Sequence, residues 1–294
     1  MLRFDLQSHS LHSDGALPPA EVVARAADAG VELLALTDHD SVDGVAEAIA
    51  AGDRLGVRVI PAAELSSVHG GLEDLHVLGY GVDIADETWL ERLRGARAER
   101  VQRAERMGEL LRELGFSLDG APLEQRRAAG ASIGRPHLAA AVVSHPDNRE
   151  RLQRESVADV SPFIATYLVP GAPAYLPRTH PTVAEAIGWI GEAGGVAVWA
   201  HPFWDVEAPD EVLAAIDEFA ALGLGGVEAF YPTHTAEQTR LVAARCAELG
   251  LLTTGSSDFH GPDHRLFSRF LAHDLHGCEP ELGELVQVPD RPGH

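Results

Sequence analysis

Short runs of consecutive apolar residues alternate along the chain with segments whose apolar residues recur at helical spacing. The helical patterns include residues 18–30, 210–223 and 236–250, and each of them ends at a glycine suited to a helix C-cap. The apolar runs predict seven buried strands, at residues 3–8, 32–36, 57–63, 75–81, 196–200, 227–231 and 251–255. Regular alternation of strand and helix predicts an α/β fold with a parallel, right-handed sheet, and seven strands favour a barrel over an open sheet.

The alternation stops between about residue 83 and residue 180. This region contains a long charged helical pattern over residues 86–115, a second after "GRPH" and a third near residues 159–168. It is too long to be a loop. We therefore expect a mostly helical domain, residues 83–180, inserted into a barrel made of residues 1–82 and 181–278. Residues 279–294 are rich in Pro, Gly and Glu, and we expect them to form a poorly ordered tail.

Composition and charge limit the classes of partner. The formal net charge is −22, which disfavours a long nucleic-acid groove but leaves small phosphorylated ligands open. The longest apolar runs fall far short of the ~20 residues that cross a bilayer, and the N-terminus lacks an apolar signal segment. We therefore expect a soluble, cytoplasmic protein without a membrane partner; its oligomeric state is not readable from the sequence. Cys246 and Cys278 lie in no metal-binding spacing and are expected to be ordinary reduced thiols.

Side chains that can bind metal ions recur where the predicted strands end. A lone histidine at a strand end is more often a hydrogen-bonded cap than a ligand, but here such residues lie at or beside six of the seven strands. Strand ends of an α/β barrel converge on one face, and imidazoles combined with carboxylates suit Zn, Mn or Fe. The candidate ligands are Gln7, His9 and Asp14 after the first strand, His39 after the second, Glu64 after the third, His76 inside the fourth, His201 after the fifth, and Asp258 and His260 after the seventh.

Five motifs carry a resemblance to a known family. In order and spacing, "DLQSHSLHSDG", "ALTDHDSVDG", "AAELSS", "AHP" and "SSDFH" resemble the motifs of the PHP (polymerase and histidinol phosphatase) family. In the insertion, "IGRPHLA" and "YLPR" look like a subgroup of stand-alone phosphoesterases that includes nucleoside 3',5'-bisphosphate phosphatases. The resemblance covers nearly the whole chain. It implies a distorted seven-stranded TIM-like barrel that holds two or three divalent metal ions.

The resemblance also implies three sets of ligands. The first metal would take His9, Glu64 and Asp258, with Gln7 where the family usually has histidine; Glu64 would bridge to a second metal bound by His76 and His201; and the third would use Asp14, His39 and His260. Glutamine is neutral and a weaker donor than imidazole, so the first site is expected to be weakened. The alternative is that Gln7 only hydrogen-bonds a metal-bound water.

Catalysis and substrate binding are assigned to further residues. Among the cluster, His201 and Asp258 are expected to take part in catalysis, because clustered divalent ions can activate a water for in-line attack on phosphorus. His234 in "YPTHT" is a candidate acid for the leaving group. Arg135 and His137 lie at a predicted helix start, where backbone N–H groups and a guanidinium favour a phosphate, and Arg178 in "YLPR" can join them. The alternative is a helix-capping turn with the arginine in solvent.

Several functions remain open at this point. The resemblance favours a phosphatase that acts on small monoesters, most of all on the 3'-phosphate of nucleoside 3',5'-bisphosphates. Alternatives are a histidinol-phosphate phosphatase, a 5'-to-3' exonuclease on short RNA, and a non-catalytic metal-binding scaffold. An amidohydrolase acting on C–N bonds is a further alternative, but one subtype of that class uses a carboxylated lysine and the chain has no lysine.

Overall fold

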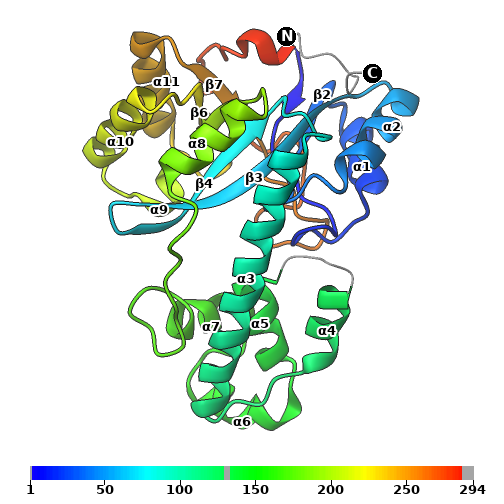
Figure 1. The fold of residues 1–294 in the computed structure, drawn as a ribbon, viewed down its shortest axis with the longest axis vertical. Helices are drawn as coiled ribbons and strands as arrows, with labels where there is room; N and C mark the ends of the chain where they lie inside the picture. The colour runs from blue at the N-terminus through cyan, green and yellow to red at the C-terminus, as the bar shows by residue number, and fades with distance from the viewer. Residues whose placement is uncertain (1, 129–132, 287–294) are drawn as a thin grey trace. The chain divides into compact units, whose positions relative to one another are not determined.

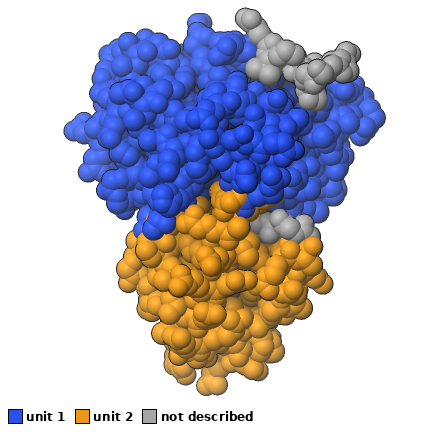
Figure 2. Space-filling view, in the orientation of Figure 1, with its two compact units in different colours: residues 1–94, 179–294 blue, residues 95–178 orange. Residues whose placement is uncertain are grey.

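The computed structural model describes residues 2–128 and 133–286, and the chain divides into two compact units. The first consists of Met1–Arg94 and Thr179–His294, and the second of Gly95–Arg178 (Figure 2). The second unit is shorter than the expected insertion because Trp89 and Leu93, early in helix α3 (Glu87–Glu113), pack into the core of the first unit. In the described residues, no helix combines the length and apolarity needed to cross a membrane.

Seven strands form one sheet whose spatial order follows the chain (Figure 1). The sheet is nearly closed into a barrel, because Leu6 N donates to Gly255 O (3.0 Å) and His9 N to Phe259 O (2.8 Å) between the first and last strand regions. The predicted α/β barrel is thus confirmed. The strands are β1 (Phe4–Asp5), β2 (Leu33–Leu36), β3 (Arg58–His69), β4 (Leu72–Tyr80), β5 (Val196–Trp199), β6 (Gly226–Phe230) and β7 (Leu252–Gly255).

The prediction of a wholly parallel sheet is wrong for β4, which runs antiparallel to both β3 and β5. The reason is the connection between β3 and β4, which consists only of Gly70 and Gly71. Both have positive φ, 56° and 90°, as a tight hairpin turn demands, and a two-residue turn can join only antiparallel strands. The reversal brings the first half of β4, with His76, to the end of the barrel where β3 and β5 finish.

Helices flank the sheet in the first unit (Figure 1). Their bounds are α1 (Pro19–Ala29), α2 (Val45–Leu55), α8 (Val183–Glu192), α9 (Pro202–Asp205), α10 (Pro209–Ala221) and α11 (Ala236–Leu249). α1 and α2 pack on β2 and β3 through an apolar cluster that includes Val22, Ala48 and Val59. α8 begins with a capping box, in which Thr182 and Glu185 satisfy each other's backbone N–H groups. These helices supply the apolar cover that holds the strand ends in register.

The second unit is helical and has a separate hydrophobic core. Besides most of α3, it contains α4 (Gly120–Ala128), α5 (Arg135–Val143), the short 3₁₀ helix η1 (Pro146–Asn148), α6 (Arg149–Arg154) and α7 (Val160–Tyr167). Phe116, Phe163 and Tyr167 contact one another at the centre of this core, with ring centroids 4.9–5.3 Å apart. The unit therefore has the apolar interior expected of an independent domain.

Part of the expected tail is well packed. The 3₁₀ helix η2 (Gly283–Val286) places Leu285 in the main core, and the Arg58 guanidinium donates to Leu285 O at 3.0 Å. The prediction of poor order is wrong for residues 279–286. Leu282 and Leu285 pack into the main core, and a composition rich in Pro, Gly and Glu does not indicate these contacts. Residues 287–294 lie outside the described range.

Candidate metal centre

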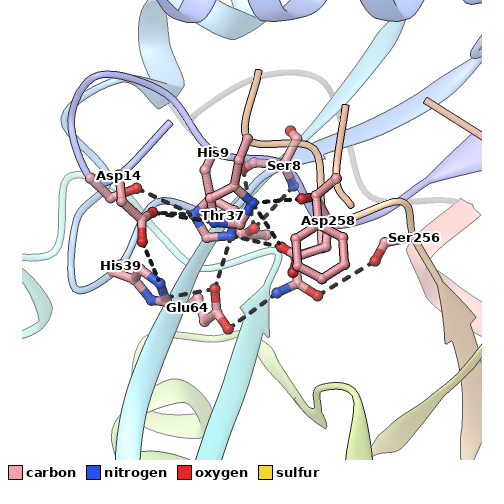
Figure 3. A network of polar contacts seen from close by, with 12 residues as sticks. Ser8, His9, Asp14, Thr37, His39, Glu64, Ser256 and Asp258 are labelled. Carbon is pink, nitrogen blue, oxygen red and sulfur yellow. Dashed lines mark hydrogen bonds and ion pairs between the residues drawn. The ribbon is translucent and has the colours of Figure 1, made fainter. Parts of the chain in front are cut away.

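All nine side chains predicted as ligands lie in one cluster in the first unit. Glu64, fully buried on β3, lies at its centre. Figure 3 shows His9, Asp14, His39 and Asp258 arranged around it. Five side chains approach the Glu64 carboxylate: Gln7 Nε2 at 3.1 Å, His9 Nε2 at 3.1 Å, His39 Nδ1 at 3.4 Å, His76 Nδ1 at 2.7 Å and His201 Nε2 at 3.5 Å. Segments far apart in the sequence thus meet at one carboxylate.

One group of atoms has the spacing of ligands around a single ion. His9 Nε2 lies 3.1 Å from Glu64 Oε2 and 3.2 Å from Asp258 Oδ1. All three atoms are buried and form no hydrogen bond with acceptable geometry. Donor atoms bound 2.0–2.2 Å from one ion are themselves about 2.8–3.6 Å apart. Two carboxylate oxygens and one imidazole nitrogen, buried together without a hydrogen bond, match the donor set of a divalent cation.

A second group uses the other oxygen of the same carboxylate. Glu64 Oε1 is 2.7 Å from His76 Nδ1 and 3.5 Å from His201 Nε2, and the two imidazole nitrogens are 3.1 Å apart. Because one oxygen of Glu64 faces each group, its carboxylate is placed to bridge two ions. These residues fit the second ligand set that the motifs imply.

The third implied set is also brought together. Asp14 Oδ2 is 3.5 Å from His39 Nε2, and Asp14 Oδ1 is 3.5 Å from His260 Nε2. His9 shares this neighbourhood, since its ring stacks on that of His260 with centroids 4.3 Å apart. The nitrogen and oxygen atoms of His9, Asp258 and His260 also lie close enough together to bind one ion. The candidate ligands on the loops after β1 and β7 can therefore be assigned to ion sites in more than one way.

Two of the candidate ligand side chains project from strained backbone. His201 has φ 29° and Asp258 has φ 53°, values that L-residues rarely adopt. Such conformations persist only where surrounding contacts enforce them, and they cluster at functional sites. Here the backbone N–H of His201 donates to Glu228 Oε2 at 2.9 Å, and Asp258 Oδ2 accepts a hydrogen bond from Tyr231 at 2.8 Å. These contacts aim both side chains at Glu64 and His9.

The carboxylates and imidazoles shift each other's pKa values. Burial favours the neutral form of Glu64, but the charges of His76 and His39 prevail and hold its pKa well below the usual value. Burial likewise opposes the charge on His201, but Glu64 raises the pKa of His201 to about 9. Without ions, protons on the imidazoles therefore compensate the negative charge of the buried carboxylates. A divalent cation would replace those protons.

Residues outside the nine candidate ligands support the cluster. Glu228, fully buried on β6, accepts from Ser256 Oγ at 2.6 Å as well as from the His201 backbone, and burial raises its pKa to about 8. Asp38 accepts hydrogen bonds from the side chains of Ser10 and Ser13, both at 2.6 Å, and so orders the loop after β1. Glu228 was not predicted from the sequence, and the available signal was a lone acidic residue in the apolar strand "GVEAF".

Gln7 takes part in this cluster through both ends of its amide. Its Nε2 donates to Glu64 Oε1 at 3.1 Å, and its Oε1 faces Ser256 Oγ at 3.5 Å. Ser256 in turn donates to Glu228. In this arrangement Gln7 orients the bridging carboxylate, and its own oxygen is directed to a serine. Its role as a metal ligand stays a prediction.

Replacing Gln7 by histidine tests that role. We expect Gln7→His to tighten the weakest metal-binding step by roughly tenfold, because imidazole is a better donor than an amide. Calorimetric titration of metal-free protein gives both affinity and stoichiometry, with Gln153→His, at an exposed position of α6, as the matched control. Unchanged binding in Gln7→His would restrict residue 7 to hydrogen bonding.

His234, the proposed general acid, lies beside the cluster, and its protonation state differs from that of the clustered histidines. Its Nδ1 is 3.1 Å from Ala229 O, and its ring contacts Tyr231 and Phe203 with centroids 5.4 Å away. Burial lowers the pKa of His234 to about 4, so the ring is neutral at pH 7. A neutral ring with Nδ1–H directed at a carbonyl is a poor proton donor. Its role as general acid stays a prediction.

The three predicted substrate-binding residues belong to the second unit. Arg135 begins α5, and His137 Nδ1 accepts a hydrogen bond from Gly134 N at 3.0 Å, as a helix cap does. Arg178, whose side chain is buried, ends the unit. The capping function of His137 is thus observed, whereas phosphate binding by these residues stays a prediction.

The two cysteines are both free thiols, in agreement with the sequence. Cys246 is buried in the main core, and burial raises its pKa to about 12. It therefore packs as a small apolar residue.

Comparison with known proteins links this geometry to a family. The PHP domain profile matches residues 5–113. The chain is 36% identical over 265 residues to the 3',5'-nucleoside bisphosphate phosphatase of Chromobacterium violaceum, covering 89% of this chain and 88% of the relative. It is 31% identical over 262 residues to a 5'-3' exoribonuclease of Haemophilus influenzae, covering 88% and 90%.

A solved structure extends the similarity to the whole fold. This structure, of an amidohydrolase from Chromobacterium violaceum with bound sulfate, superposes with a TM-score of 0.81 at 32% identity and covers 99% of this chain and 98% of its own. The chain therefore belongs to the PHP family.

Proposed function

We propose that this PHP-family phosphoesterase hydrolyses small phosphate monoesters, with the 3'-phosphate of nucleoside 3',5'-bisphosphates as its preferred target. The observation that carries the proposal is the buried cluster around Glu64, in which carboxylate and imidazole atoms 2.7–3.5 Å apart offer adjoining ion sites. The relative from Chromobacterium violaceum, 36% identical, supports the choice of substrate.

Two or three divalent ions, Zn, Mn or Fe, fit this donor set. Once bound, they would supply an activated water and neutralise charge on the phosphoryl oxygens. Glu64 would contribute one oxygen to each of two groups of ligands, Oε2 beside His9 and His39 and Oε1 beside His76 and His201. Tyr231 fixes the orientation of Asp258 through a 2.8 Å hydrogen bond, and Glu228 fixes the backbone of His201. These residues thereby preorganise the site, and little rearrangement is needed during the reaction.

The preference for a second phosphate rests on the insertion. The motifs "GRPH" and "YLPR" supply Arg135, His137 and Arg178, and we propose that they bind the anionic group that does not react. A second charge-assisted contact adds binding that positions the reacting phosphate. The net charge of −22 is consistent with a small ligand rather than a long nucleic acid.

A second candidate function is 5'-to-3' exonuclease activity on short RNA. It is favoured by the 31% identity to the exoribonuclease of Haemophilus influenzae. Histidinol-phosphate hydrolysis uses the same metal chemistry but needs no second anion. A non-catalytic scaffold would be marked by loss of several candidate ligands, whereas eight of the nine positions carry His, Asp or Glu and only Gln7 departs from the family pattern.

Relative kcat/KM values decide among these functions. We expect adenosine 3',5'-bisphosphate to exceed 3'-AMP by about 10- to 150-fold, the effect of one charged contact, and to yield 5'-AMP. Phosphate release with metal-loaded protein would be compared for these two substrates, 5'-AMP, histidinol phosphate and a short 5'-phosphorylated RNA. Equal efficiency on mono- and bisphosphates contradicts the two-anion proposal. Preference for histidinol phosphate or RNA transfers the assignment to that alternative.

A further inference from the structure

An aromatic cluster of Trp204, Tyr231 and Phe267 lies next to the metal centre, and of its members only Tyr231, through its hydrogen bond to Asp258, has a part in the chemistry proposed above. Its outermost member is Trp204 on α9, three residues after the ligand His201. Trp204 is 48% exposed, whereas Trp89 and Trp199 are 1% exposed. All four tryptophans of the chain lie in described segments, and Trp189 is the remaining, half-buried one. Trp204 thus differs from the others in presenting much of its indole to solvent.

Ring contacts connect Trp204 to the ligand side chains. Its centroid is 5.7 Å from Phe267, 6.3 Å from Tyr231 and 6.5 Å from His201. Tyr231 donates a hydrogen bond to Asp258, and Phe267 is 5.7 Å from the ring of His260. A molecule bound at the metal centre therefore lies within reach of the indole.

The geometry of these contacts leaves the indole able to stack. The rings of His201, Tyr231 and Phe267 meet it at 69°, 77° and 56°, so none of the three lies parallel to it. Tyr231 and Phe267 are themselves buried and support the indole from within the barrel end. The result is a partly exposed aromatic side chain, supported by two buried rings, at the edge of the site.

Two other exposed apolar residues lie at helix ends. Leu222, 43% exposed, follows the end of α10, and Leu249, 38% exposed, ends α11. Single exposed apolar side chains of this kind are ordinary features of protein surfaces. Trp204 is distinguished from them by its contacts with a metal-ligand histidine and with the tyrosine that orients another ligand.

We propose that Trp204 is a specificity-determining residue that stacks on a planar aromatic group of the substrate, a nucleobase. The inference rests on the proposed function in taking the reacting molecule to be a nucleotide. Stacking on an aromatic side chain tolerates every base, because each has a π face. The enzyme is therefore selective for nucleotides over sugar phosphates without strong preference among bases.

Equilibrium binding tests this inference without requiring turnover. The ligands are 5'-AMP and ribose 5-phosphate, which share the sugar and phosphate and differ in the base. Calorimetry on metal-loaded protein would compare the wild type with Trp204→Ala, Trp204→Phe and the control Leu222→Ala. We expect Trp204→Ala to weaken 5'-AMP binding by roughly 5- to 150-fold and to change ribose 5-phosphate binding by less than about twofold. Trp204→Phe should retain most of the affinity.

Three outcomes would overturn the inference. They are an equal loss for both ligands in Trp204→Ala, wild-type binding of 5'-AMP no tighter than that of ribose 5-phosphate, or the same loss in Leu222→Ala. Metal content and circular dichroism of each variant would confirm that the site and fold are retained. If the wild type fails to hydrolyse adenosine 3',5'-bisphosphate, the proposed function fails, but the binding comparison still decides the role of Trp204.

Discussion

Chelation of divalent ions is expected to abolish phosphatase turnover, and Mn²⁺ or Zn²⁺ should restore it. The buried atoms His9 Nε2, Glu64 Oε2 and Asp258 Oδ1 face one another without hydrogen bonds, an arrangement that an ion satisfies. Without ions, no group in the cluster has an evident means of activating water. Phosphate release and elemental analysis would be measured before chelation, after it, and after reloading. Full turnover by protein without detectable metal would falsify the mechanism.

Binding of metal ions to the metal-free protein should become tighter as the pH rises. The pKa of His201 is raised to about 9 in the metal-free protein, and that of His9 lies well above its usual value. Protons therefore occupy these imidazoles at pH 7 and compete with metal ions. Affinity should rise as pH increases from about 6 to 9, with proton release on binding. Titrations in buffers of different ionisation enthalpy measure that release.

Glu64→Gln is expected to remove metal from both groups that share this carboxylate and to lower kcat/KM by about a thousandfold or more. The side chain of Glu64 contacts Gln7 and four histidines, and each of its oxygens faces a different group. The amide has nearly the same shape but no charge, so it keeps the packing and loses the ion binding. Metal content, kcat/KM and the increase in Tm on adding metal would be measured together.

The matched control is Glu237→Gln in the first turn of α11, where the side chain is exposed. It should keep wild-type metal content, kcat/KM and metal-dependent Tm. If Glu64→Gln behaves like this control, Glu64 does not bridge ions and the ligand sets must be reassigned. Loss of folding is distinguished by the circular dichroism of the metal-free variants.

Most of the barrel was predictable from local patterns. Buried strands appear as short apolar runs, and the predicted run at residues 227–231 nearly coincides with β6 (Gly226–Phe230). Helix ends were marked by glycines, as at Gly30 and Gly250. Strand direction was not visible in hydrophobicity, because a buried strand has the same pattern in either direction. The Gly70–Gly71 pair was the available local signal for the reversal of β4.

The candidate ligands were also identified from the sequence, because ligand chemistry depends on residue type and strand-end position. Histidines and carboxylates after successive strands had to converge once the sheet closed. What the sequence could not show is which atoms meet. The distances that place one Glu64 oxygen in each ligand group depend on the closed sheet and on the reversed β4 that carries His76.

The sequence by itself determined the family motifs, the order of strands and helices, and the residue types at the strand ends, because these depend on neighbours along the chain. Only the tertiary structure decided the partners of Gln7, the buried support from Glu228, the neutral state of His234 and the position of Trp204 beside the ligands. The physical reason is that hydrogen bonding, desolvation and ring contacts act over a few ångströms in space. Gln7 and Ser256, 249 positions apart in the chain, become neighbours only when the first and last strands close the barrel.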